Sequence, residues 1–158
     1  RVSVKLGAED EGKLQLDDKP PQDRGFRVFK LAESNFTSWD ASVRDATALT
    51  AQLKLHVDHI REGRGERDIL FEIILKSGLS LTAAVEERTI GGKVVHLVDG
   101  VSLVVCLDRT LTLDLLHGLV ELAPGKVVVL DAGFVGNDQL KTNAVHLFGA
   151  KGIVFRTV

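Results

Sequence analysis

The chain has 158 residues, with 20 lysines and arginines against 22 acidic residues, a net charge of −2 and a pI near 6.2. This length suits one domain with a hydrophobic core, and the charge balance excludes the strongly basic footprint of a self-sufficient nucleic-acid binder. Cys106 is the single cysteine, which excludes a disulfide framework or a cysteine-based zinc site. With no signal peptide and no apolar run of roughly 18 residues, we expect a cytosolic protein, and the absence of methionine predicts a piece of a longer polypeptide.

The first 24 residues are typical of a chain end and a linker. Residues 1–6 are compatible with a short strand, whereas residues 7–24 are acidic and polar and hold two of the three prolines. From Phe26 to Leu31, apolar and polar residues alternate, which predicts a half-buried strand with Phe26, Val28 and Phe29 in the core. We therefore expect a folded domain over residues 25–158.

Two helices are predicted before the main group of strands. Apolar residues recur every three or four positions from Asp40, as the helix cap, to Ile60, which predicts a helix of about six turns that ends at Gly63. A second helix is predicted over Glu66–Ser77. It is apolar on nearly every side, so we expect other elements to enclose it.

The C-terminal half has the pattern of a mixed sheet. Residues 85–90, 93–98 and 101–107 read as strands separated by Gly91-Gly92 and Asp99-Gly100, which predicts an antiparallel meander. After the meander, helix, strand, helix and strand follow over residues 111–124, 126–130, 137–149 and 152–158. The predicted fold class is α/β: a mixed sheet with an antiparallel meander followed by a βαβαβ parallel part, with two helices preceding it. Cys106 fits this sheet as a small buried apolar residue.

Asp108 and Asp131 each follow a predicted strand, where open α/β sheets hold ligands. If the two strands are neighbours, about 4.8 Å apart, the two carboxylates are placed to share a divalent cation. The alternative is that each aspartate accepts hydrogen bonds from loop amides or caps the following helix.

The stretch DAGFVGNDQLKTNA, residues 131–144, has glycines ahead of a helix but no nucleotide-binding motif. We expect Asn137 to cap that helix, and the amide of Asn143, at the border of its packed stripe, to find a partner in the preceding loop. The stretch is therefore interpreted as a hydrogen-bonded corner.

Two further groups of residues have a functional and a structural interpretation. His56 and His59 are three apart, which suits a metal as well as an exposed helix face. Arg61, Arg64 and Arg67 suit phosphate contacts, but the neighbouring acids favour a solvated loop.

Several stretches together resemble one family. They are GFRVFKL, SNF and WD within residues 25–40, VEERTIGGK at 85–93, VVCLD at 104–108, and DAGF and KTNA within 131–144. In this order they resemble the C-terminal region of the DNA-methylating (Mod) subunit of type III restriction-modification systems, which are adenine-specific DNA methyltransferases. The resemblance covers roughly residues 20–158.

The resemblance implies a bacterial cytoplasmic protein whose chemistry lies upstream of this chain. The family's [DN]PP[YFW] loop for the flipped adenine and its glycine-rich segment for S-adenosylmethionine do not occur here. Residues 1–6 are then the tail of the methyltransferase domain and residues 7–24 its linker. No catalytic, cofactor-binding or metal-binding residue is implied in this fragment. The matched or candidate interaction residues are Glu87, Arg88, Asp108, Asp131, Phe134, Lys141 and Asn143.

The function expected from this resemblance is assembly: Mod dimerisation, docking of the restriction (Res) subunit, or support of DNA bound by the parent complex. S-adenosylmethionine is expected in the parent protein only. The alternative is a small α/β enzyme or ligand- or metal-binding domain that uses the edge formed by Asp108 and Asp131. A third possibility is direct DNA binding through Arg61, Arg64, Arg67 and Lys141.

Overall fold

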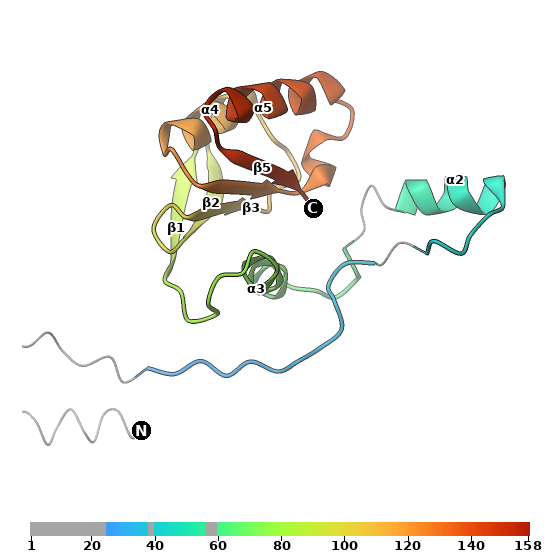
Figure 1. Cartoon of the computed structure of the whole chain (residues 1–158), viewed down its shortest axis with the longest axis horizontal. Helices are drawn as coiled ribbons and strands as arrows, with labels where there is room; N and C mark the ends of the chain where they lie inside the picture. Colours follow the sequence, from blue (N-terminus) through green and yellow to red (C-terminus); the bar gives the residue numbers. More distant parts are fainter. Residues whose placement is uncertain (1–24, 38–39, 56–59) are drawn as a thin grey trace, which may run out of the picture. The chain divides into compact units, whose positions relative to one another are not determined.

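The computed structural model describes residues 25–37, 40–55 and 60–158, apart from the side chains of residues 54 and 55. The chain divides into two compact units, Arg1–Ala32 and Glu33–Val158. The described helices and strands all belong to the second unit. In chain order (Figure 1) they are α2 (Ala46–Leu55), α3 (Glu66–Lys76), β1 (Val85–Ile90), β2 (Lys93–Val98), β3 (Leu103–Cys106), α4 (Leu113–Glu121), β4 (Lys126–Val129), the 3₁₀ helix η2 (Asp131–Phe134), α5 (Asp138–Ala150) and β5 (Val154–Thr157).

The five strands form one mixed sheet in the order β1-β2-β3-β4-β5. Strands β1, β2 and β3 are antiparallel neighbours, and β3, β4 and β5 are parallel neighbours. The predicted fold class is therefore confirmed. Gly91 and Gly92 have positive φ angles of 55° and 76°, as a tight hairpin turn requires. A Cβ atom on Gly91 would lie 2.9 Å from the backbone of Leu115, because this turn packs directly on α4.

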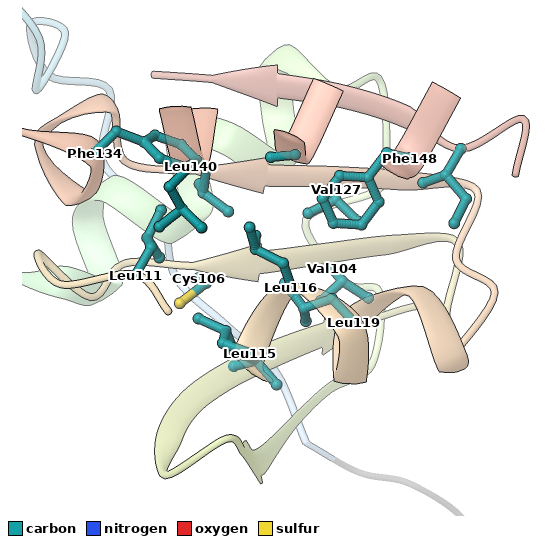
Figure 2. Close-up of a cluster of buried hydrophobic side chains, with 14 of the residues drawn as sticks. Val104, Cys106, Leu111, Leu115, Leu116, Leu119, Val127, Phe134, Leu140 and Phe148 are labelled. Carbon is teal, nitrogen blue, oxygen red and sulfur yellow. The ribbon is translucent and has the colours of Figure 1, made fainter. Parts of the chain in front are cut away.

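Two hydrophobic clusters lie on opposite faces of the sheet, because successive side chains of a strand alternate between faces. Helices α4 and α5 cover one face and α3 packs on the other (Figure 1). Figure 2 shows the first cluster, which includes Val104, Cys106, Leu115, Leu116, Leu119, Val127, Phe134, Leu140 and Phe148. Cys106 is fully buried there, as predicted.

The strand predicted from Phe26 to Leu31 is wrong. The described residues 25–34 contain no strand, and Phe26 is 87% exposed. Val28 and Leu31 are also exposed, and Phe29 is less so. Alternation produces a strand only where a neighbouring strand completes the hydrogen-bond ladder and a core receives the apolar face.

The first predicted helix is shorter than expected. Helix α2 begins at Ala46, and Asp45 caps it by accepting a hydrogen bond from the backbone nitrogen of Ala48 (2.9 Å). Asp40 instead accepts hydrogen bonds from the backbone and hydroxyl of Ser42, so it forms a local turn. Two short polar side chains compete here for the role of cap, and the one nearer to the helix takes it.

Helix α2 is described as far as Leu55, and Ile60, which belongs to the predicted helix, forms an isolated bridge with Phe36. His56 and His59 lie outside the described residues. Helix α3 ends at Lys76 with Ser77 as its cap, one residue before the predicted end. Other elements bury only one face of α3, and Leu75 is 57% exposed. The expectation that this helix is enclosed on all sides is therefore wrong.

No helix in the described part of the chain combines the length and the hydropathy needed to cross a membrane.

Candidate functional site

The carboxyl ends of β3 and β4 place Asp108 and Asp131 at equivalent positions. Cys106 pairs with Val129 in the parallel register, and each aspartate follows two residues later. Strands β3 and β4 are neighbours, so the condition under which the two carboxylates could share a cation is met by the backbone register. This edge of the sheet is the place to look for a site in an open α/β fold.

A lysine neutralises Asp108. The Nζ atom of Lys93 lies 3.0 Å from Asp108 Oδ1, and the backbone nitrogen of Thr110 donates to the same oxygen at 2.7 Å. Lys93 begins β2, whose antiparallel register with β3 places it opposite Asp108. The β1–β2 hairpin thus places a positive charge at the end of β3. The backbone amide of Thr110 supplies the loop hydrogen bond expected if Asp108 has a structural role.

A second lysine neutralises Asp131. The Nζ atom of Lys141, in α5, lies 2.5 Å from Asp131 Oδ1. The backbone nitrogen of Asp131 donates to the oxygen of Val158 at 2.7 Å, which attaches η2 to the end of β5. Asn137 caps α5, as predicted, by accepting a hydrogen bond from the backbone nitrogen of Leu140 (3.0 Å). The cap sets the start of α5, and one turn later the helix presents Lys141 to η2.

The two ion pairs change what this edge can do chemically. A divalent cation would have to bind next to two ammonium groups or displace them from the aspartates, which is electrostatically costly. No cluster of three or more histidine, cysteine or acidic side chains suited to a metal occurs among the described residues. The thiol of Cys106 lies just before this edge, and its burial raises its pKa, so it remains an inert thiol.

The space between the two strand-end loops is filled. A Cβ atom on Gly133 would lie 2.6 Å from Leu111 Cγ and 3.1 Å from the backbone oxygen of Asp108. The backbone nitrogen of Leu111 also donates to the oxygen of Gly133 at 3.2 Å. Phe134 is buried and packs edge-to-face on Phe155, with the ring centroids 6.3 Å apart. Gly133 is thus a point of close packing, in line with the predicted corner.

Three other matched residues lie away from this edge. Glu87 and Arg88 project from β1 and are exposed, and Glu87 Oε1 lies 3.8 Å from His96 Nδ1. Asn143 is exposed on α5. The predicted bond between its amide and the preceding loop is not found in the described structure, because the helix turns this position away from the packed face.

A polar contact missed by the sequence analysis joins Glu72 of α3 to residues 34–36. Ser34 Oγ donates to one carboxylate oxygen at 2.5 Å, and the backbone nitrogen of Asn35 donates to the other at 2.6 Å. Asn35 Nδ2 also donates to the backbone oxygen of Asp68 at 2.9 Å. The only signal in the sequence is a lone acid within the apolar run of α3.

The environment of Glu72 also sets its ionisation. Burial alone raises the pKa of Glu72, but hydrogen bonds from Lys76, Ser34 and Asn35 outweigh it and leave the pKa lowered from its ordinary value of 4.5. Lys76 Nζ lies 2.7 Å from Glu72 and 4.9 Å from the ring centroid of Phe36. Polar and aromatic contacts therefore hold residues 34–36 against α3.

The arginine-rich loop is partly engaged within the chain. Arg61 Nη1 lies 2.5 Å from Glu33 Oε2, and the backbone nitrogen of Arg61 donates to the oxygen of Asn35. Arg61 and Lys141, two of the four residues considered for DNA contact, thus already have acidic partners. No family model matches the sequence, and no curated protein is significantly similar to it.

Proposed function

We propose that this chain is the non-catalytic C-terminal α/β domain of a type III restriction-modification adenine-specific DNA methyltransferase, the Mod subunit, and that it serves subunit assembly. Its partners are then another Mod subunit or the Res subunit, and DNA is bound through the parent complex. S-adenosylmethionine binds to the parent protein in the bacterial cytoplasm, outside this domain. The support is the order of the motifs and the use that the fold makes of them.

The observation that carries the proposal is that the polar residues of separate motifs pair with each other. Lys93 of VEERTIGGK pairs with Asp108 of VVCLD, and Asp131 of DAGF pairs with Lys141 of KTNA. In each case the charges join two elements that are separate in the sequence. A domain whose motif residues stabilise its own architecture suits a structural role better than a catalytic one.

An apolar surface for assembly is available on α2. Leu49 and Leu53 are four residues apart, so they lie on the same side of the helix, and both are exposed. Pairs of leucines at this spacing are typical anchors for a partner helix or groove. We place the subunit contact at this side of α2.

The test replaces both leucines by aspartate in the parent Mod protein. We expect Leu49→Asp/Leu53→Asp to weaken Mod dimerisation or Res capture by about tenfold or more, since charges cannot enter an apolar contact, while methylation by the parent is retained. Sedimentation and a binding assay with purified Res measure the two contacts separately. The matched control is Val145→Asp, which adds a charge at an exposed apolar position of α5.

Two results would contradict this function. The first is DNA methylation by the isolated chain in the presence of S-adenosylmethionine. The second is unchanged assembly of the double variant with both Mod and Res.

The register that aligns Asp108 with Asp131 favours the alternative, a metal- or ligand-binding domain at that edge. Calorimetry with Mg²⁺ separates the two hypotheses. The lysine pairs predict no binding heat, and heat that disappears in Asp108→Asn/Asp131→Asn would favour the alternative.

A further inference from the structure

A cleft of about 450 Å³ lies on the face of the sheet that α3 packs against. The end of α3, the start of β4 and the strand β5 contribute to it, and its polar lining consists of Lys76, Ser77, Lys126, Arg156 and Thr157. Phe36 and Val128 belong to its apolar part. Its volume lies in the range of small-ligand sites, roughly 300–1,000 Å³.

The sheet register gathers two of the cations. Val128 pairs with Arg156 in the parallel register of β4 and β5, and Lys126 lies two residues before Val128 on the same face. Val128 belongs to the cluster on the α3 face, which places both cations on that face too. Strand β5 is the edge of the sheet, so the cleft is bounded on that side by no further strand among the described elements.

No acidic side chain among the described residues lines this cleft. Glu72 pairs with Lys76, but its side chain is only 12% exposed, and it already accepts hydrogen bonds from Ser34 and Asn35. Lys126 Nζ donates to the neutral hydroxyl of Ser77 at 3.1 Å.

Arg156 is exposed, and it has no ion-pair partner among the residues that the structure describes. Lys76 lies in the last turn of α3, where it complements the negative end of the helix dipole, and Lys126, at the start of β4, donates to Ser77 at the same helix end. This helix end does not account for Arg156, which lies on β5. An exposed guanidinium on the same face as an ammonium and a hydroxyl has the donor set that binds a phosphate group.

We propose that this cleft binds a phosphate group, with Lys126 and Arg156 as its charged donors and the hydroxyl of Ser77 as a neutral donor. The phosphate belongs either to a free nucleotide or to the backbone of duplex DNA. This inference goes beyond the assembly role, and it does not depend on the family resemblance.

The experiment measures both sources on the same protein. Calorimetry with ADP and with inorganic phosphate reports the free ligands, and fluorescence anisotropy with a labelled DNA duplex at several salt concentrations reports the backbone. In Lys126→Gln/Arg156→Gln we expect binding of the preferred ligand to weaken by about tenfold or more. If that ligand is DNA, the slope of log affinity against log salt also falls by about one for each lost contact.

The matched control is Arg44→Gln/Lys151→Gln, which removes the same charge from two exposed positions outside the cleft. It is expected to bind like the unsubstituted chain. Thermal unfolding checks that both double variants fold, and Lys126→Arg/Arg156→Lys, which keeps both charges, is expected to lose less affinity than Lys126→Gln/Arg156→Gln.

If the cleft variant loses ADP binding but not DNA binding, the ligand is a free nucleotide. If it loses DNA binding but not ADP binding, the ligand is the DNA backbone. The proposal is overturned if the unsubstituted chain binds none of the three probes, or if the control loses as much affinity as the cleft variant. The leucine substitutions in α2 leave this cleft intact, so failure of the assembly proposal and failure of this one are separate results.

Discussion

Helices α2 and α5 begin in the same way and lie in different environments. Each is capped by a side-chain oxygen three residues before the amide that it binds, from Asp45 in α2 and Asn137 in α5. Each also carries apolar residues four apart. In α5 the series Leu140, Ala144 and Phe148 is buried on the sheet, whereas in α2 the described members of the series are exposed.

The difference shows which step of folding the spacing of apolar residues controls. Spacing and a cap are local properties, and they are sufficient to set where a helix begins. Burial depends on a second surface, which the sheet provides for α5. For a ten-residue helix such as α2, local signals alone give marginal stability, because helix nucleation is costly and few hydrogen bonds follow it.

The largest expected effect comes from removing one apolar side chain from each helix. Phe148 is 0% exposed and stacks on Phe155 with ring centroids 4.9 Å apart, so we expect Phe148→Ala to lower the free energy of unfolding by about 3–5 kcal/mol. Leu53 is 56% exposed, and we expect Leu53→Ala to change the free energy of unfolding by less than about 0.5 kcal/mol. Urea unfolding followed by circular dichroism measures both variants. Equal losses would show that α2 is as much a part of the core as α5.

The same contrast explains which parts of the fold follow from the sequence. The strands and the last two helices follow from it because β-branched runs, hairpin glycines and the Asn137 cap act locally and agree with their burial. The strand predicted at Phe26 and the long helix predicted from Asp40 fail because their apolar spacing has no packing surface in the described structure. Sequence spacing does not say whether such a surface exists.

For the candidate site at Asp108 and Asp131, only the position could be predicted from the sequence. Placing Asp108 and Asp131 at strand ends needs no more than the strand pattern. Their lysine partners depend on two long-range facts: the hairpin register that brings Lys93 to Asp108, and the docking of α5 that brings Lys141 to Asp131. The positions of Lys126 and Arg156 in the cleft beside α3 depend in the same way on the pairing of β4 with β5.

A smaller effect is expected at Glu72, which holds residues 34–36 against α3 and so tests how far the cooperative unit extends toward α2. Because hydrogen bonds lower the pKa of this carboxyl from 4.5, its contribution to stability is complete above about pH 5 and is lost as the pH falls through the folded pKa. We expect Glu72→Gln to lower the free energy of unfolding by about 2 kcal/mol at pH 7. The difference from the unsubstituted chain should shrink steadily below about pH 4.5.

Urea unfolding at pH 7 and at several values down to pH 3 measures this dependence. The control is Glu62→Gln, an exposed acid in the loop before α3, for which we expect less than about 0.5 kcal/mol at every pH. A pH-independent loss in Glu72→Gln would show that the carboxylate acts through its shape and packing, with its charge irrelevant.

The smallest effect separates the two helices most directly, because the same kind of bond is removed from each. Asn137→Ala deletes the cap of α5, and we expect global stability to fall by about 1 kcal/mol, since α5 unfolds only with the sheet beneath it. Asp45→Ala deletes the equivalent bond in α2, where we expect global stability to stay within about 0.3 kcal/mol while the amide of Ala48 exchanges faster with solvent. Hydrogen exchange resolved by residue, together with urea midpoints, measures both. If Asp45→Ala lowered global stability as much as Asn137→Ala, α2 would be coupled to the core through its backbone although its leucine side chains are exposed. Local signals would then account for more of this fold than burial does.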